Sequence, residues 1–181
     1  LADICEATEH AGEVIGRLRA MLKRDSTAAD LTNVDVNHAI RIVERIVHGD
    51  ANLHKVTVHL DLSSNVRPVK GDSVQLQQVV LNLMLNAFSA MNDGGRRLVV
   101  VRTNSIDGSN VLVEVQDSGT GIAPEKLESI FDPFITSKPE GLGMGLSICR
   151  SIIERHGGKI SAANNPDRGA KFSITLPAIL E

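Results

Sequence analysis

The sequence predicts an α/β fold, a two-layer sandwich in which about three helices cover one face of a mixed sheet, preceded by one helix of a helical bundle. Stretches with the alternating apolar pattern of strands and stretches with the three-and-four spacing of helices follow one another along most of the chain. An Asp-Gly pair between two β-branched runs predicts a hairpin. The N-terminal residues instead carry the continuous apolar seam of a bundle helix.

Composition bounds the class of protein. The chain has 181 residues, which is enough for one domain with a core and an appendage of a few turns. Its net charge of −3 provides no broad field for attracting nucleic acid, so no nucleic-acid partner is expected. No apolar run approaches the roughly 18 residues of a membrane span, so any membrane attachment is expected outside this sequence. Cys5 and Cys149 have no metal or redox spacing, which favours reduced thiols in the cytoplasm.

The first segment is expected to be a bundle helix followed by a linker, residues 1–29, with the main domain in residues 30–181. The seam consists of Ile4, Ala7, Ala11, Val14, Leu18 and Met21, widened by Thr8, Ile15 and Leu22. A stripe of this width suits a four-helix bundle, so the helix needs partners, and a homodimer in the intact protein is expected. Because the periodicity is already under way at Leu1, which is not Met, a larger parent protein is expected.

The first half of the domain alternates strands and helices. Residues 34–36 and 56–62 have strand patterns, and Asn37 is expected to cap a helix that runs to about residue 48. Asp72 is expected to cap a long helix that ends near residue 91.

The second half begins with strands at 98–103 and 111–116, and Asp107-Gly108 between them predicts the hairpin. After a loop region, a helix is expected over 145–156. Two last strands, 159–163 and 170–176, are expected to join through residues 164–169.

The helix after Asp72 carries an unusual polar stripe. It consists of Gln75, Gln78, Asn82, Asn86 and Ser89. A solvated face would explain the spacing, but asparagine is a poor helix former, and no charged residue occurs between positions 73 and 92. A neutral amide stripe beside a charged ligand is the alternative. Asn82 and Asn86 lie one turn apart, and their oxygens would suit Mg²⁺ shared with phosphate.

Two glycine-containing segments follow. Asp117, Gly119 and Gly121 come directly after an apolar strand, where the carboxylate could accept a hydrogen bond from an exocyclic amine and the bare backbone could lie against a flat base. A simple Asp-Gly turn is the competing interpretation. The second segment is Gly141, Leu142, Gly143, Met144 and Gly145. It opens a helix that begins with Leu146, so its N–H groups could face an anion. Neither the P-loop nor the Rossmann pattern fits it.

Between these segments lies 131–140, which contains Phe131, Phe134 and Lys138. Half of the four phenylalanines of the chain fall here, beside one lysine and between glycines. This composition favours a mobile cover with an apolar hinge and a cation for a phosphate. An ordinary surface loop with two buried aromatic anchors is the competing interpretation.

Taken in order, these four segments resemble the N, G1, F and G2 boxes of histidine kinase catalytic domains in the GHKL superfamily, which also contains Hsp90-, gyrase- and MutL-type ATPases. The resemblance covers about residues 30–181 and implies a Bergerat-type site for ATP and Mg²⁺. It implies that Asn86 coordinates Mg²⁺, that Asp117 reads the adenine amine and that Lys138 is the lid lysine. The other nucleotide contacts that it implies are Gly119, Gly121, Ile122, Phe131, Thr136, Ser137, Gly141, Leu142, Gly143, Met144, Gly145 and Leu146.

One position separates kinase from ATPase. In superfamily members that hydrolyse ATP, a glutamate one turn before the metal asparagine activates water. Here that position is Asn82, and an amide cannot usefully accept a proton at neutral pH. The resemblance therefore implies a histidine kinase whose catalytic residues are Asn82, Asn86 and Lys138, with the γ-phosphoryl group kept for a protein acceptor. A GHKL ATPase, a protein serine kinase and a nucleotide-gated module without phosphotransfer remain as alternatives.

The phosphoacceptor is expected to lie outside this chain. In the family it occupies the first bundle helix, as a histidine followed by an acidic residue, and the sequence begins on what resembles the second helix. None of the six histidines has this context, so the chain is expected to bind ATP with little self-phosphorylation. The resemblance further implies relay of the phosphoryl group to an aspartate in the receiver domain of a response regulator.

Overall fold

The computed structural model describes residues 31–91, 95–136 and 142–180. The bundle helix and linker expected over residues 1–29 lie outside the described residues. The elements, in chain order, are β1 (Thr32–Val34), α2 (Val36–Leu53), β2 (Thr57–Leu62), β3 (Val69–Gly71), α3 (Ser73–Ser89), β4 (Leu98–Ile106), β5 (Asn110–Asp117), the 3₁₀ turn η2 (Pro124–Lys126), α4 (Gly145–Arg155), β6 (Lys159–Asn164) and β7 (Ala170–Pro177).

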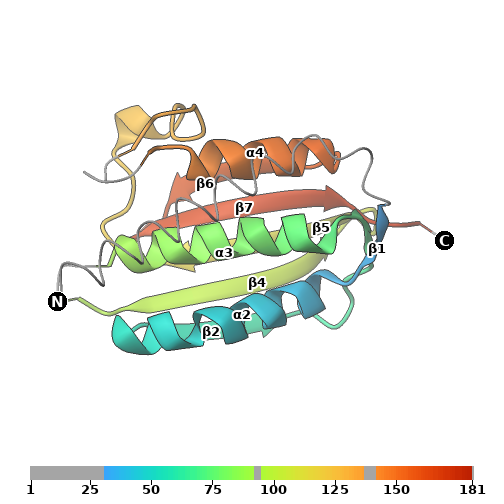
Figure 1. Ribbon diagram of the computed structural model, residues 1–181, viewed down its shortest axis with the longest axis horizontal. Helices are drawn as coiled ribbons and strands as arrows, with labels where there is room; N and C mark the ends of the chain where they lie inside the picture. Colours follow the sequence, from blue (N-terminus) through green and yellow to red (C-terminus); the bar gives the residue numbers. More distant parts are fainter. Residues whose placement is uncertain (1–30, 92–94, 137–141, 181) are drawn as a thin grey trace, which may run out of the picture. The chain divides into compact units, whose positions relative to one another are not determined.

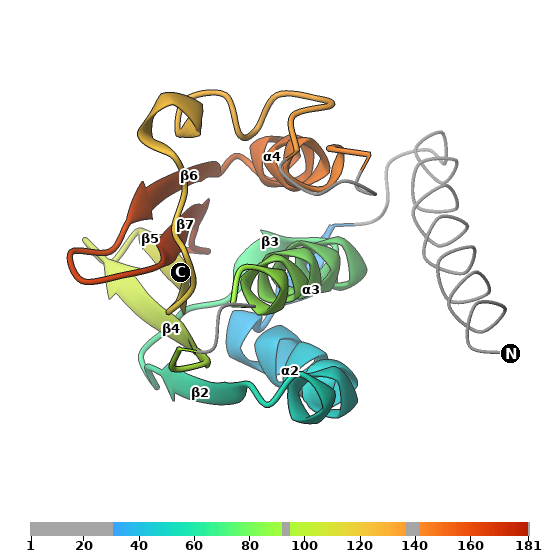
Figure 2. The same ribbon diagram turned by 90° about the vertical axis from the view of Figure 1, so that its left-hand side faces the viewer.

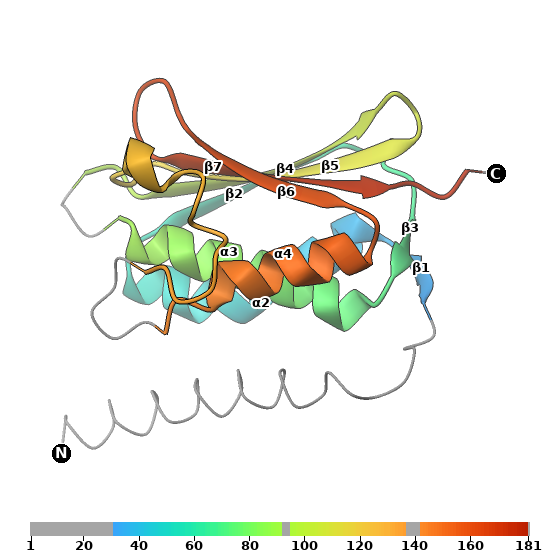
Figure 3. The ribbon, with the colours of Figure 1, turned by 90° about the horizontal axis from the view of Figure 1, so that it is seen from above.

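The domain has two layers, a five-stranded sheet and three helices on one of its faces (Figure 3). The strand order is β2-β4-β5-β7-β6, with β2 parallel to β4 and every other neighbour antiparallel. α3 packs between α2 and α4, as the end-on view in Figure 2 shows. This is the mixed-sheet sandwich that the sequence predicts, and that prediction is confirmed.

The core lies between the layers. α3 contributes Leu83 and Met84, which are fully buried, and α2 contributes Ile40. From the sheet, Val99 and Val101 of β4 point toward the helices, because alternate residues of a strand face opposite sides.

Two predicted features are confirmed in detail. Asp72 caps α3, since its side chain accepts hydrogen bonds from the N–H groups of Val74 and Gln75. The β4–β5 hairpin turns at Asp107 and Gly108, whose φ angles of 53° and 65° match the type I′ turn that joins such strands.

The start of α2 differs from the prediction. Asp35, and not Asn37, is the N-cap, and its carboxylate accepts the N–H of His38 at 3.0 Å. Asn37 lies inside the helix and points to the sheet, where it accepts a hydrogen bond from Thr103 and donates one to the Ser63 carbonyl. The helix extends to Leu53, five residues beyond the expected end at residue 48. The first strand, expected at residues 34–36, instead lies at Thr32–Val34, because Asp35 already caps α2. No sequence pattern predicted β3, which pairs with β1 in a separate two-stranded sheet.

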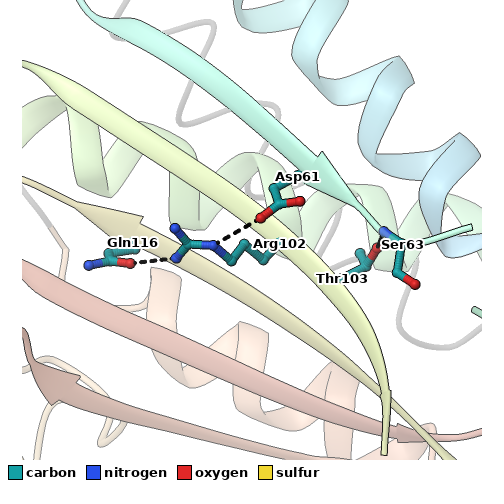
Figure 4. A network of polar contacts seen from close by, with 5 residues as sticks. All are labelled: Asp61, Ser63, Arg102, Thr103 and Gln116. Atoms are coloured by element: carbon teal, nitrogen blue, oxygen red, sulfur yellow. Dashed lines mark hydrogen bonds and ion pairs between the residues drawn. The ribbon is translucent and has the colours of Figure 1, made fainter.

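On the face of the sheet opposite the helices, polar side chains of neighbouring strands contact one another. Arg102 donates to Asp61 on β2 at 3.3 Å and to Gln116 on β5 at 2.8 Å (Figure 4). A hollow of about 240 Å³ lies over this region. It is lined by Asp61, Ser63, Arg102, Thr103, Asn104, Leu112 and Glu114.

No helix within the described ranges is both long and apolar enough to cross a lipid bilayer.

Candidate functional site

The predicted site segments gather at one end of the sandwich. Figures 1 and 3 show the C-terminal end of α3, the start of α4 and residues 118–136 at this end. Contacts join them: the N–H of Thr120 donates to the carbonyl of Ala90 at 3.2 Å, and Asn82 packs against Gly145. The helix with the amide stripe therefore touches both glycine-containing segments.

Asp117 ends β5 as a buried carboxylate, with only 4% of the residue exposed. Its Oδ1 atom accepts the N–H groups of Gly119 at 2.8 Å and Ala170 at 3.2 Å. Within the described ranges, no hydrogen bond reaches Oδ2. Burial raises the pKa of Asp117 above its ordinary value of 3.8, and the hydrogen bonds from Gly119 and Ala170 act in the opposite direction. One oxygen is thus fixed and the other can accept a donor from a ligand.

The glycines after Asp117 make close contacts. A side chain on Gly119 would place its Cβ 2.4 Å from the Ala90 carbonyl oxygen, so this residue lets the loop pack on the end of α3. Gly121, at φ +78°, lies against the side chain of Asn164. The backbone of Ile122 is held by the same side chain through two hydrogen bonds of 2.7 Å.

The amide stripe on α3 is not a solvated face. Gln75, Gln78, Asn82 and Asn86 are half-buried, and only Ser89 is exposed. Asn82 faces α4, where its Nδ2 donates to the sulfur of Cys149 at 3.3 Å. A Cβ on Gly145 would fall 2.8 Å from the same nitrogen. Asn86 lies one turn further along α3, and its backbone carbonyl accepts the N–H of Ala90.

Cys149 therefore has a role that its sequence position did not indicate. It is 1% exposed and lies one turn into α4, so it holds Asn82 against the helix start. Burial raises the pKa of its thiol to about 11, while the hydrogen bond from Asn82 acts in the opposite direction. The sulfur is thus a neutral thiol at physiological pH, and it both packs in the core and orients a site residue.

The start of α4 suits an anion. Met144 is the N-cap, and its side chain makes no capping hydrogen bond. The N-cap side chain therefore accepts none of the first N–H groups of the helix. Gly143, at φ +65°, accepts the N–H of Phe134 at 3.0 Å, and a Cβ there would collide with the Phe134 backbone. Leu142 is exposed and Leu146 is half-buried.

The two phenylalanines of the predicted cover differ. Phe131 is buried and meets the ring of Phe172 on β7 edge-on, with centroids 6.3 Å apart. Phe134 is 75% exposed, so the alternative of two buried anchors holds for Phe131 only. Thr136 is exposed. Ser137, Lys138 and Gly141 lie outside the described residues.

The residues that join β6 to β7 complete the site, and sequence reasoning missed most of them. Three side chains there make hydrogen bonds with the backbone of residues 117–122, those of Asn164, Asn165 and Arg168. The available signal was weak, because two adjacent asparagines before a glycine resemble any turn.

Comparison with known proteins places the chain in a family. Residues 71–179 match the family described as histidine kinase-, DNA gyrase B-, and HSP90-like ATPase, and the chain belongs to it. It is similar to the sensor protein TdiS of Thauera aromatica, with 36% identity over 172 residues, which cover 93% of this chain and 31% of TdiS. It is likewise 34% identical to the sensor histidine kinase ZraS of Escherichia coli K12 over 174 residues, covering 96% of this chain and 36% of ZraS.

Solved structures agree. The catalytic domain of histidine kinase ThkA superposes with a TM-score of 0.74 at 32% identity, covering 83% of this chain and 97% of that one. Full-length ShkA in complex with AMPPNP gives a TM-score of 0.75 at 26% identity, covering 86% of this chain and 33% of ShkA. The predicted family is thus confirmed, and the chain spans about a third of the length of the curated relatives that it matches.

Proposed function

We propose that this chain binds Mg·ATP at the α3–β5–α4 end and, within its parent protein, transfers the γ-phosphoryl group to a histidine on the dimerisation bundle. The phosphohistidine then supplies an aspartate of a response regulator. The observation that carries the proposal is the buried carboxylate of Asp117, held among the described residues through Oδ1 alone, at the end of the fold where the amide stripe meets an uncapped helix start.

The residues present fit the nucleotide. Oδ2 of Asp117 accepts the exocyclic amine of adenine, and the N–H groups at the start of α4 face the phosphates, where the helix dipole also favours negative charge. Asn86 is the residue that would hold Mg²⁺, which supplies positive charge between the phosphate oxygens. Lys138 would meet the γ-phosphate. Transfer of this kind depends mainly on positioning and charge, so a clamp of neutral amides and N–H groups suffices.

Asn82 favours transfer to a protein over hydrolysis. Its side chain is an amide, which donates to Cys149 and packs on Gly145, and an amide cannot act as the general base that would activate water. Two similar proteins add support: ShkA was solved in complex with AMPPNP, and ThkA, at 28% identity and a TM-score of 0.77, in complex with the response regulator TrrA. For the parent protein, the proposal includes a homodimer through the bundle helix and a receiver-domain partner.

The test has two stages. Isothermal titration calorimetry should detect binding of Mg·ATP to the chain and none to Asp117→Asn; binding that is equal in both would contradict the site. The chain lacks tryptophan and tyrosine, so calorimetry is preferable to intrinsic fluorescence.

In the second stage, γ-labelled ATP is added with a separately expressed first bundle helix of the parent protein. Acid-labile label on the histidine of that helix supports the kinase. Binding without transfer would instead support a nucleotide-gated module, and stable label on a histidine of this chain would contradict the proposal.

A further inference from the structure

Residues 164–169, which comprise the end of β6 and its connection to β7, contact the segment that carries Asp117. The backbone of this connection lies directly on that residue: Gly169 has φ +90°, and a Cβ there would fall 2.0 Å from the Asp117 carbonyl oxygen. Only glycine permits this approach. The next N–H, from Ala170, donates to Oδ1 of Asp117. The orientation of the carboxylate therefore depends on where this connection lies.

Asn165 fixes the connection in place. The two N–H groups of its Nδ2 share three acceptors, the carbonyls of Asp117 at 2.9 Å, Arg168 at 3.2 Å and Ala170 at 3.3 Å, so one amide joins the end of β5 to the turn and the start of β7. Its backbone N–H donates to the carbonyl of Gly169 at 2.9 Å. A half-buried amide with this many partners is costly to replace, because each carbonyl would lose a donor.

The side chains of Asn164 and Arg168 make further hydrogen bonds with the same segment, residues 117–122. Asn164 accepts the N–H of Ile122 and donates to its carbonyl, both at 2.7 Å, in the pattern of a strand neighbour. Arg168 donates from Nε to the carbonyl of Gly119 at 3.1 Å. The segment 117–122 is thus held from the β6–β7 side as well as by α3.

We propose that Asn165 is a positioning residue that sets the preference for a 6-amino purine, an inference that rests on the proposed ATP site. Asn165 keeps the Ala170 N–H on Oδ1, so that Oδ2 faces the base as an acceptor. Without that restraint the carboxylate can rotate, and the distinction between an amine and a carbonyl at position 6 is weakened.

The experiment measures a ratio. Affinities for Mg·ATP and Mg·ITP are determined by calorimetry for the unaltered chain, Asn165→Asp and Asn110→Asp. Inosine triphosphate carries a carbonyl oxygen where ATP carries the amine. That oxygen is an acceptor and is repelled by the Oδ2 atom of Asp117. Asn165→Asp keeps the shape but has no N–H to donate. Asn110→Asp adds the same charge at the opposite end of β5, where the amide donates only to Ser109 within the described residues.

The unaltered chain should favour ATP over ITP by about 10-fold or more, as expected when one buried polar group loses its partner. In Asn165→Asp this ratio should fall by about fivefold or more, chiefly through weaker ATP binding, whereas Asn110→Asp should keep both affinities within about twofold.

An unchanged ratio in Asn165→Asp, including an equal loss of both nucleotides, would overturn the positioning role while leaving the ATP site intact. If the unaltered chain binds no ATP, the proposed function fails first. Should Asn165→Asp not fold, Asn165→Ala, which adds no charge, replaces it. If neither variant folds, Asn165 serves the fold alone and the proposal is wrong.

Discussion

Asp117 shows how one residue can oppose stability and serve binding. Its carboxylate is almost fully buried and receives two N–H groups on a single oxygen. Desolvation outweighs those bonds, so the pKa is raised, and the ionised form is less favourable in the folded chain than in the unfolded one. The ionised form becomes more favourable when a ligand donates a hydrogen bond to Oδ2 of Asp117. Such a group is more readily explained by ligand recognition than by folding.

Asp117→Asn is therefore expected to unfold at the same or a higher temperature than the unaltered chain at pH 7, because the amide oxygen can still accept both N–H groups without a buried charge. In the unaltered chain, between pH 3.8 and the raised pKa, the folded state holds a proton that the unfolded state has lost. Stability should therefore fall as pH rises through this window. Thermal unfolding between pH 4 and pH 8 checks this, and a steeper pH dependence in Asp117→Asn would contradict it.

At the scale of elements, polar contacts join α3 and α4 at two places. Near the site, Asn82 contacts Cys149. At the far end, the buried ring of His156 accepts the N–H of Asp72 at 3.0 Å through Nε2, and its Nδ1 lies 2.7 Å from the Ile152 carbonyl. The Nδ1–H tautomer satisfies both contacts. The histidine therefore links the end of one helix to the cap of the other.

Replacing His156 with leucine should cost about 1–3 kcal/mol of unfolding free energy, because the Asp72 N–H loses its acceptor in a buried place. Urea denaturation measures the loss. His48→Leu is the matched control: that side chain is 68% exposed and its Nδ1 lies 3.8 Å from the Glu44 carboxylate, so a change within about 0.5 kcal/mol is expected. Similar losses in the two variants would refute the role of His156.

At the scale of the whole molecule, the site is built from segments distant in sequence, so a ligand there should stabilise the entire domain. Binding only to the folded state adds about 2.7 kcal/mol at a ligand concentration 100 times Kd. The segments that would contact the proposed ligand come from α3, β5 and α4, which span both layers.

Mg·ATP at that concentration should raise the unfolding temperature by about 5–10 °C for a domain of this size. Differential scanning calorimetry with and without nucleotide is the measurement. Arg102→Leu, on the opposite face of the sheet, should show the same rise, whereas Asp117→Asn should show little. A rise of equal size in Asp117→Asn would mean that the nucleotide binds elsewhere.

Local signals predicted much of this fold. Asp72 caps α3 because its carboxylate reaches N–H groups two and three residues ahead, and Asp107-Gly108 turns the hairpin because both can adopt positive φ. Where two capping residues stood close together, local signals failed. Asp35 caps α2, while Asn37 makes its contacts across the fold with Thr103 and Ser63.

The candidate site divides in the same way. The sequence by itself determined the strands of the five-stranded sheet and the helices, though not β3, and it identified the glycine-containing segments, Asp117 and the amide stripe, because spacing and residue type act over a few neighbours. Only the tertiary structure decided that Asn82 faces Cys149 and that Asn165 holds the backbone of Asp117, 67 and 48 residues away in sequence. Hydrogen bonds depend on distance and direction in space, and those are settled only when the sheet and its helices have packed.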